Sequence, residues 1–333
     1  MITRARLLCS SILWIAAMSV SLAGCSTSQP PISASNALPQ TSSTAQHAAR
    51  GKSWMLPDAT ASDLIYVTGG CDGTCVLSYP GGEMVGSLNV GFGLNSGVCS
   101  DSHGNVYIAD NNDSPNSAVV EYAHGGTTPI ARFNLPGRSA GACSVDPTSG
   151  NLAVMFIGSN DDVAIFTNAS QEPQLYAALD GFSCAYDPVG NLFVGGLSGQ
   201  SAGLAELPKG SSHFGMLTIK SDRPIWGAGQ VQWYGNTLSY SSGFINAALI
   251  YRLKIYGTNA EVVKTTRLDH TRYMWYPWIY QGKIIVAWVK HGVSSNELGI
   301  WDYPKGGKVI QKITGFDIDG LGLESVTVSV APH

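Results

Sequence analysis

Short apolar runs alternate with polar turns along most of the chain. Three stretches share one pattern, in which an apolar run, an Asp, a polar turn ending in Gly-Asn and a second apolar run follow one another. They are residues 97–110 (GVCSDSHGNVYIAD), 141–154 (GACSVDPTSGNLAV) and 181–194 (GFSCAYDPVGNLFV). Asp, Asn and Gly suit tight turns because they tolerate left-handed backbone or bond to nearby N–H groups. The pattern predicts β-hairpins and gives Asp101, Asp146 and Asp187 a structural role.

The hairpin recurs at a regular period. Weaker copies lie at residues 231–240 and 278–288. The turn glycines Gly104, Gly150, Gly190, Gly235 and Gly282 are separated by 46, 40, 45 and 47 residues. Two more apolar runs lie between successive hairpins, and four strands in such a period are typical of a propeller blade. The region from 63 to 330 has 268 residues, so the mean period of 44.5 predicts six blades.

The two ends of this region complement each other. The first unit begins directly with DLIYVT (63–68) and lacks an innermost strand, whereas LESVTVSV (323–330) comes last and has no following partner. Pairing these two segments would close the ring and remove two exposed strand edges. The sequence therefore predicts an all-β, six-bladed β-propeller with four antiparallel strands per blade, closed by the C-terminal strand 323–330 in the first blade.

The N-terminus has a different character. A basic start, MITRAR, precedes an apolar stretch of about 16 residues and the tetrapeptide LAGC at 22–25. This resembles a bacterial lipoprotein signal, which implies cleavage before Cys25 and lipidation of that residue. We expect a signal peptide at 1–24, a disordered tether at 25–59 and the propeller at 60–333, held at the membrane of the bacterial cell envelope by its lipid. An uncleaved anchor helix is the alternative, but the apolar stretch is short for one.

Composition narrows the choice of partners. The formal net charge is −4 and only 13% of the residues are charged. No run of Lys and Arg of the kind that neutralises phosphates occurs, so nucleic acid is not an expected partner. We expect a monomer that binds a small molecule, a glycan or an envelope protein.

The cysteines fall into two groups. Cys71 and Cys75 flank a tight loop and are predicted to form a disulfide in an oxidising compartment, the alternative being two free thiols. Cys99, Cys143 and Cys184 occupy the same position in successive first strands. Taking about 10 Å between neighbouring inner strands, beyond the roughly 7 Å limit for a disulfide, we expect these three to be unbonded packing residues.

Ligand sites in propellers usually lie at the mouth of the central channel. The loops that enter the inner strands carry the candidate rim residues Asn95, Arg138, Asp180, Arg223, Asp269, His270, Asp317 and Asp319. Such a mixed rim suits a small polar ligand, although any set of solvated loops carries similar charges. Aromatic residues gather beside the inner strands of the last two blades, at Trp226, Trp233, Trp275, Tyr276 and Trp278. Packing between blades is the favoured interpretation of these aromatic residues. If a ligand binds at this side of the channel mouth, we expect Trp275 to stack against it.

The segments SVDPTSGNLAV, CAYDPVGNLFV and VVEYAHGGTTPIARF resemble the extracytoplasmic six-bladed propellers of the NHL-repeat and gluconolactonase-like group. That resemblance implies a divalent metal such as Ca²⁺, with Glu324, Asp180 and Asn95 as its ligands. Arg138 and the stretch DRPIWGAG stand where the group has further Asn ligands, so the set is incomplete. We expect no cofactor and a binding or scaffold protein. A metal-dependent lactonase, hydrolase or lyase is the alternative.

Overall fold

The structure is a computed structural model. It describes residues 52–91, 96–112, 116–157, 163–167, 172–199, 201–225, 227, 229–242, 248–271, 273–289, 297–316 and 322–332. Within these ranges the side chains of Tyr273, Trp275, Trp288 and Val289 are not described. The compact unit that contains the described residues runs from His47 to His333.

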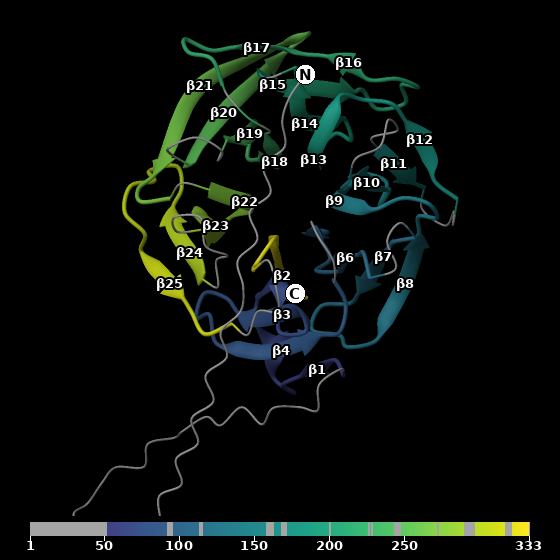
Figure 1. Ribbon diagram of the computed structural model, residues 1–333, viewed down its shortest axis with the longest axis vertical. Coiled ribbons are helices and arrows are strands. Elements are labelled where there is room, and N and C mark those ends of the chain that lie inside the picture. Colours follow the sequence, from purple (N-terminus) through teal and green to yellow (C-terminus); the bar gives the residue numbers. More distant parts are fainter. Residues whose placement is uncertain are drawn as a thin grey trace, which may run out of the picture. The chain divides into compact units, whose positions relative to one another are not determined.

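Six β-sheets are arranged around a common centre, which confirms the predicted propeller (Figure 1). Blade 1 contains β1 (Trp54–Met55), β4 (Met84–Leu88), β3 (Gly73–Ser78), β2 (Leu64–Gly70) and β26 (Val326–Ser329), in that order. Blade 2 contains β5 (Val98–Ser100), β6 (Val106–Asp110), β7 (Ala118–Tyr122) and β8 (Pro129–Asn134). Blade 3 contains β9 (Ala140–Val145), β10 (Leu152–Phe156), β11 (Val163–Phe166) and β12 (Gln174–Tyr176).

The other three blades follow the same plan. Blade 4 contains β13 (Asp180–Tyr186), β14 (Leu192–Ser198), β15 (Ser201–Leu207) and β16 (Gly215–Met216). Blade 5 contains β18 (Gln230–Tyr234), β19 (Thr237–Ser242), β20 (Ala248–Tyr256), β21 (Asn259–Leu268) and β17 (Thr218–Lys220). Blade 6 contains β22 (Tyr273–Tyr280), β23 (Lys283–Val289), β24 (Glu297–Asp302) and β25 (Gln311–Ile313). A 3-10 turn, η1 (Ala59–Ala61), precedes β2.

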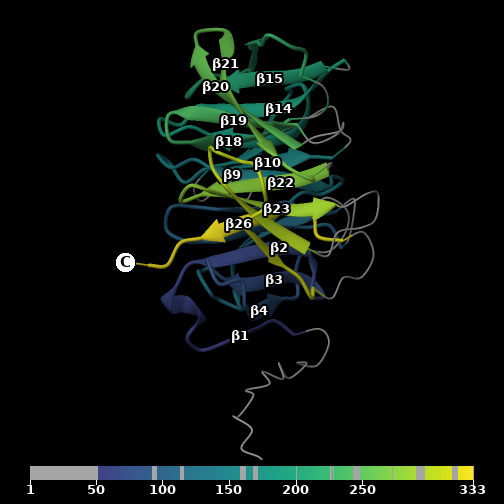
Figure 2. The same ribbon diagram turned by 90° about the vertical axis from the view of Figure 1, so that its left-hand side faces the viewer.

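The C-terminal strand closes the ring as predicted. β26 pairs antiparallel with β2, from Leu64 opposite Ser329 to Val67 opposite Val326. It is the innermost strand of blade 1, and both views place it beside β2 (Figures 1 and 2). The first and last parts of the propeller therefore share one sheet.

Two strands extend the four-stranded plan. β1 precedes residue 60 and pairs antiparallel with the outer strand β4 of blade 1. β17 pairs in parallel with β21 of blade 5 and directly follows β16, the outer strand of blade 4. A single chain segment thus joins the outer edges of blades 4 and 5.

The repeated turns have the predicted chemistry. In the first, Oδ1 of Asp101 accepts hydrogen bonds from the N–H groups of His103 and Asn105, both at 2.9 Å. Asp187 does the same for Val189 and Asn191, at 3.0 and 2.8 Å. The five predicted turn glycines all have φ between 62° and 93°, a region that favours glycine. The prediction that these Asp residues are structural is confirmed.

The hydrophobic core is divided among the junctions between blades. Each of six buried clusters draws its residues from two neighbouring blades, including the cluster shared by blades 6 and 1. Among the largest fully buried side chains are Trp301, Tyr66 and Tyr240. Blades are therefore held to one another by apolar packing on both faces, and the inner strands are left to line the centre.

Candidate functional site

The inner strands of all six blades surround a central cavity of about 170 Å³. Its walls are formed by Val98–Ser100, Ala142–Val145, Ser183–Tyr186, Gln230–Trp233, Tyr276–Trp278 and Ser325–Val326. None of these lining residues is Asp, Glu, Lys, Arg or His. A cavity of this volume has room for several waters or one small molecule. A neutral lining favours a neutral occupant.

Side chains of the inner strands connect adjacent blades around this cavity. Oγ of Ser144 in blade 3 accepts the N–H of Tyr186 in blade 4 at 3.1 Å. Oγ of Ser183 in blade 4 accepts the N–H of Val231 in blade 5 at 2.6 Å. We call such side-chain bonds between adjacent blades the inter-blade links. They satisfy backbone groups at the ends of adjoining sheets, where a regular ladder cannot continue.

Two inter-blade links use a side-chain amide in both directions. Oε1 of Gln232 accepts the N–H of Ile279 at 2.7 Å, while its Nε2 donates to the carbonyl of Ile279 at 3.0 Å. Asn111 of blade 2 makes the same pair with Ala140 of blade 3, at 2.9 and 2.8 Å. Each amide therefore takes the place of one residue of a missing strand.

The closing junction and its neighbours are linked in the same way. Between blades 1 and 2, Oγ of Ser325 accepts the N–H of Val98 at 3.2 Å, and Oγ of Ser100 donates to the carbonyl of Val328 at 2.7 Å. Between blades 6 and 1, the hydroxyl of Tyr280 donates to Oδ2 of Asp63 at 2.8 Å. Ser100 and Ser325, which line the channel, thus help to hold the ring together.

The junction of blades 2 and 3 has a covalent link. The prediction that its cysteines are unbonded is wrong. Cys99 and Cys143 form a disulfide, with their Cα atoms 5.7 Å apart. The expected separation of about 10 Å applies to stacked sheets, whereas inner strands of a propeller converge towards the ring axis. Equivalent positions on neighbouring inner strands therefore come within disulfide range. Cys71 and Cys75 are also disulfide-bonded in the structure.

Cys184, the third cysteine of this series, is buried and unbonded. Burial raises the pKa of its thiol far above the ordinary value. Its sulfur lies 3.9 Å from the carbonyl oxygen of Ala153. A buried thiol held in its neutral form is a poor nucleophile, so it acts as a packing residue.

Gln230 differs from the other amides of the channel wall. It precedes Gln232 by two residues in β18, so the two side chains point to the same face of the strand. Its Oε1 is shielded from solvent and has no hydrogen-bond partner among the described residues. A buried amide oxygen without a partner costs about 1–3 kcal/mol. The amide of Gln230, a residue of the channel wall, therefore holds an acceptor that none of the described residues uses.

Tyr276 extends from blade 6 to blade 4 near the same cavity. Its hydroxyl donates to the carbonyl of Phe182 at 3.1 Å, and its ring packs against the cluster shared by blades 3 and 4. Burial, with smaller contributions from Glu324 and Cys184, raises the pKa of Tyr276 far above its ordinary value. Its φ of 35° lies in the left-handed region, within a bulge of β22. This residue closes part of the channel with a neutral phenol.

Glu324 lies at the entrance of the innermost strand of blade 1. Its Oε2 accepts the N–H of Ser96 at 2.7 Å, so the carboxylate contributes to the junction of blades 1 and 2. Asp180 is exposed at the start of β13. Among the residues that the structure describes, no group of three His, Cys, Asp or Glu side chains is close enough to hold a metal ion. Asn95, the third ligand that the gluconolactonase-like resemblance implies, lies outside the described residues.

The structure describes some of the predicted rim residues. Arg138 lies over the ring of Phe156 at 4.7 Å, and Arg223 is exposed. Asp269 donates its N–H to Gly307 of blade 6 and lies 3.9 Å from Arg267, and the adjacent His270 has a φ of 61°. Cys25, Asn95, Trp226, Asp317, Asp319 and the side chain of Trp275 lie outside the described residues.

Two of the predicted aromatic residues pack between blades. The ring of Trp233 stacks on Phe193 of blade 4, with centroids 5.5 Å apart. Trp278 packs against the cluster shared by blades 6 and 1. Both also form part of the cavity wall, so they give it flat apolar surfaces without being free to move towards a ligand.

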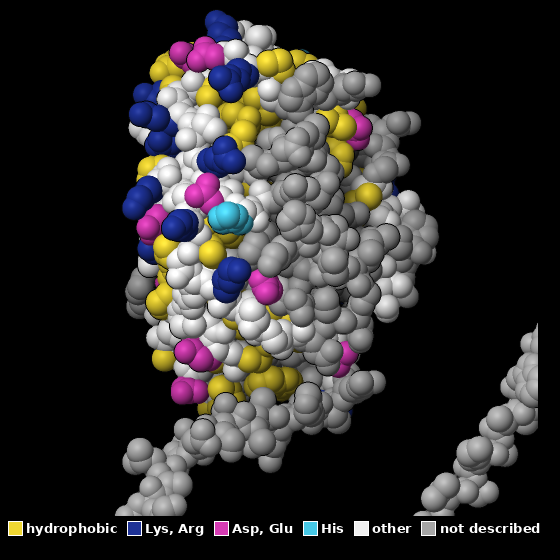
Figure 3. All heavy atoms as spheres, turned by 60° about the vertical axis from the view of Figure 1, so that its left-hand side comes forward, with side chains coloured by type: hydrophobic (Ala, Val, Ile, Leu, Met, Phe, Trp, Pro, Cys, Tyr) yellow, Lys and Arg dark blue, Asp and Glu magenta, His cyan; other side chains and the backbone are white. Residues whose placement is uncertain are grey.

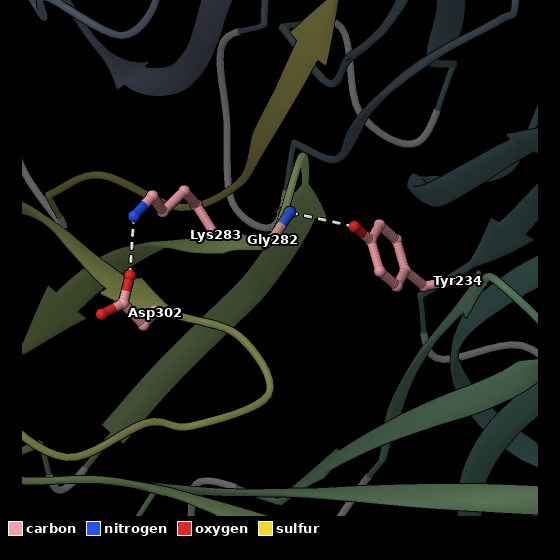
Figure 4. A network of polar contacts seen from close by, with 4 residues as sticks. All are labelled: Tyr234, Gly282, Lys283 and Asp302. Carbon is pink, nitrogen blue, oxygen red and sulfur yellow. Dashed lines mark hydrogen bonds and ion pairs between the residues drawn. The ribbon is translucent and has the colours of Figure 1, made fainter.

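The far ends of β18 and β22 carry a further link between blades 5 and 6 (Figure 4). There the N–H of Gly282 donates to the hydroxyl of Tyr234 at 2.9 Å. Next to it, Nζ of Lys283 donates to Oδ1 of Asp302 at 2.6 Å. The ion pair lowers the pKa of Asp302. The charge of Lys283 is therefore balanced locally.

A second hollow lies between blades 3 and 4, with a volume of about 470 Å³. Tyr176, Tyr186 and Lys209 are among its lining residues. Lys209 is committed to the turn of blade 3, since its Nζ donates to Oγ1 of Thr148 at 2.8 Å. This groove is larger than the channel cavity, but no unpartnered buried polar atom among the described residues points to a ligand there.

Comparison with known proteins supports the fold. No family model and no curated protein matches the chain. Among solved structures, a chain of a nidogen/laminin complex is similar with a TM-score of 0.58 and 13% identity, over 81% of this chain and all of that one. A protein of unknown function from Bacteroides caccae has a TM-score of 0.57 and 14% identity, over 80% of this chain and 99% of that one.

TolB from Acinetobacter baumannii is also similar, with a TM-score of 0.54 and 12% identity. That match covers 82% of this chain and 68% of TolB. At such low identity these likenesses show the propeller fold alone. Within the part of the chain that the structure describes, no helix is long and apolar enough to cross a membrane.

Proposed function

We propose that this chain is a lipid-anchored binding protein of the bacterial cell envelope, which holds a small neutral ligand in the central channel of its propeller. The observation that carries the proposal is Oε1 of Gln230, a buried acceptor without a partner among the described residues. Ser144, Ser183 and Gln232 of the same wall are engaged in inter-blade links. A ligand that donates a hydrogen bond to this amide would supply the missing partner.

The cavity wall defines the chemistry of that ligand. An N–H or O–H of the ligand would bond to Gln230, while Trp233 and Trp278 offer flat apolar faces. None of the described residues that line the cavity is charged, and its volume of about 170 Å³ limits the ligand's size. Small neutral hydroxyl or amide compounds, such as one sugar unit, match these limits.

The proposed location rests on the sequence. The basic start, the short apolar stretch and the LAGC site support lipidation of Cys25 and display of the propeller outside the cytoplasm. The two disulfides are consistent with an oxidising compartment. The resemblance to the NHL-repeat and gluconolactonase-like group adds that many propellers of this plan work outside the cytoplasm.

A ligand screen tests the proposed binding function. The intact chain would be titrated with neutral monosaccharides, polyols and small amides, and binding would be followed by calorimetry. We expect a ligand of this class to bind wild type and to lose at least about 10-fold in affinity in Gln230→Leu, because one hydrogen bond is worth roughly 1.4 kcal/mol. A ligand that binds both proteins equally would place the site elsewhere. Charged compounds serve as the matched negative set.

A further inference from the structure

Charge is distributed very unevenly between the two parts of the ring. Residues 52–216, which build blades 1 to 4, contain 4 Lys or Arg and 15 Asp or Glu. Residues 217–316, which build blades 5 and 6, contain 12 Lys or Arg and 5 Asp or Glu. The whole-chain charge of −4 therefore conceals a net charge of +7 on two adjacent blades. A field of this kind guides association with a partner of opposite charge.

Most of these positive charges lie on the outside of blades 5 and 6. Exposed basic side chains come from β17, β20, β21 and the turn between β24 and β25. We call this surface the basic edge and define it by Lys220, Lys254, Lys264, Arg267, Lys305 and Lys308. Figure 3 shows dark-blue Lys and Arg side chains spread along this side of the ring.

Backbone contacts make the basic edge continuous across the two blades. Leu268, at the end of β21, forms a parallel bridge with Gly307 in the turn between β24 and β25. The N–H of Gly307 donates to the carbonyl of Arg267 at 2.8 Å. Arg267 and Lys308, which flank these contacts in sequence, are therefore held next to the same junction.

Local acidic groups do not balance the basic edge. On the sheet of blade 5, Glu261 is the residue opposite both Lys220 and Lys254, so one acidic residue stands beside two basic ones. Asp269 lies 3.9 Å from Arg267, and both side chains are well exposed. Exposed pairs of this kind are screened by water and contribute little. A net positive surface remains.

Apolar side chains are exposed among these charges. Tyr256, at the tip of the β20–β21 hairpin, is 55% exposed and lies two residues from Lys254 on the same strand. Ile310 is 50% exposed and lies two residues from Lys308. Val263, beside Lys264, is 38% exposed. Interspersed Lys, Tyr and aliphatic side chains are typical of surfaces that rest in the headgroup region of a membrane.

We propose that the basic edge docks on a membrane surface rich in anionic phospholipid headgroups. The lysines and Arg267 would contact the phosphates, while Tyr256 and Ile310 enter the interfacial layer. Blades 5 and 6 then face the bilayer and the propeller stands on its rim. The proposal depends neither on the ligand of the channel nor on lipidation of Cys25.

Vesicle binding tests the proposal with the chain from residue 26 to 333, which lacks the signal and the lipid-acceptor cysteine. Every strand of the ring lies between residues 54 and 329, so this form retains the complete propeller. We expect it to bind vesicles of phosphatidylglycerol and phosphatidylcholine at low salt, and not vesicles of phosphatidylcholine alone. Binding should weaken as salt is raised, because screening shortens the range of the attraction.

Two matched variants distinguish the effect of the basic edge on vesicle binding from the effect of the net charge of the protein. The triple change Lys254→Glu, Lys264→Glu, Lys308→Glu should weaken binding by at least about 100-fold, which corresponds to about 1 kcal/mol for each basic residue. The control triple Lys52→Glu, Arg132→Glu, Lys209→Glu has the same charge change on blades 1, 2 and 4 and should bind at least 10 times more tightly than the first triple. Equal loss in both would overturn the proposal, as would the absence of vesicle binding by wild type.

A further variant distinguishes a membrane from a soluble polyanion. Tyr256→Ser with Ile310→Ser removes the exposed apolar groups and leaves every charge in place. We expect about a 10-fold loss of vesicle binding and unchanged binding to dextran sulfate. Unchanged vesicle binding would show that the surface recognises polyanions in general and would overturn the membrane proposal.

Discussion

The side-chain amide of Gln232 in blade 5 occupies both backbone polar groups of Ile279 in blade 6, with distances of 2.7 and 3.0 Å. Two residues earlier, Gln230 faces the same cavity with an Oε1 that has no partner among the described residues. The same residue type at neighbouring positions of one strand thus has two different roles. One side chain holds the ring together, and the other has an acceptor without a partner among the described residues.

The disulfide between Cys99 and Cys143 should contribute strongly to stability. It closes a loop of 44 residues, whereas Cys71 and Cys75 are only 4 residues apart. The loop-entropy relation gives about 4 kcal/mol for the long loop and about 2 kcal/mol for the short one. We expect Cys99→Ser with Cys143→Ser to lower the free energy of unfolding by more than Cys71→Ser with Cys75→Ser, as measured by urea unfolding. A larger loss of unfolding free energy in the Cys71 and Cys75 variant would contradict the expectation that the disulfide between blades 2 and 3 contributes more to stability.

His124 should make the ring sensitive to mild acid. Its side chain is 8% exposed, its Nδ1 lies 2.7 Å from Oγ of Ser329 in β26, and its Nε2 lies 3.1 Å from the carbonyl of Ser62. Burial lowers the pKa of His124 below its ordinary value of 6.5, although nearby Asp63 opposes this shift. The unfolded chain therefore takes up a proton before the folded one as the pH falls.

The sign of the resulting pH dependence is fixed by linkage. Stability from neutral His124 is complete above about pH 6.5 and is lost as the pH falls through the lower pKa of the folded state. The slope is at most about 1.4 kcal/mol per pH unit for one proton. Urea unfolding between pH 7 and pH 5 should show this slope in wild type and a reduced slope in His124→Asn. His103→Asn, in the exposed turn of blade 2, should retain it. An equal slope in wild type and His124→Asn would contradict the assignment.

Removal of the closing strand should destabilise the whole propeller. Deletion of residues 323–333 removes the β26 ladder and the buried side chains Leu323, Val326 and Val328. Each such side chain contributes roughly 1.5–3 kcal/mol, so the loss is comparable with the stability of a domain. The control deletion of 331–333 removes one bond from Asp63 and should cost about 1 kcal/mol. Thermal unfolding within two degrees of wild type for the longer deletion would rule out closure by this strand.

Much of the fold follows from local sequence signals. The Asp and Gly residues of each hairpin lie within a few positions of one another, so the turns could be predicted without knowing any contact between blades. The spacing of the turns then predicted the period and the ring. The pairing of the closing strand was predicted because each end of the propeller region has one segment without a partner in its own repeat. β1 was not predicted because this strand contains only Trp54 and Met55 and follows a polar stretch.

The features that were missed depend on distances between blades. Cys99 and Cys143 are bonded because inner strands converge, which a sheet spacing does not reveal. The repeated Gln of QVQW at 230–233 was a signal for two amides on one face, but only the structure shows which is engaged. The basic edge was overlooked because its residues come from strands far apart in the sequence.

The comparison of Gln230→Leu with Gln232→Leu tests the account most directly. Both changes replace an amide of β18 by an apolar side chain of similar size. Gln232→Leu leaves the N–H and carbonyl of Ile279 without their partners and should lower the free energy of unfolding by about 2–4 kcal/mol. Gln230→Leu removes an amide oxygen without a partner among the described residues, so in the absence of ligand it should be neutral within about 0.5 kcal/mol or stabilising. Equal destabilisation by the two variants in urea unfolding would show that Gln230 is also a structural link, and would contradict the claim that the channel holds an acceptor for a ligand.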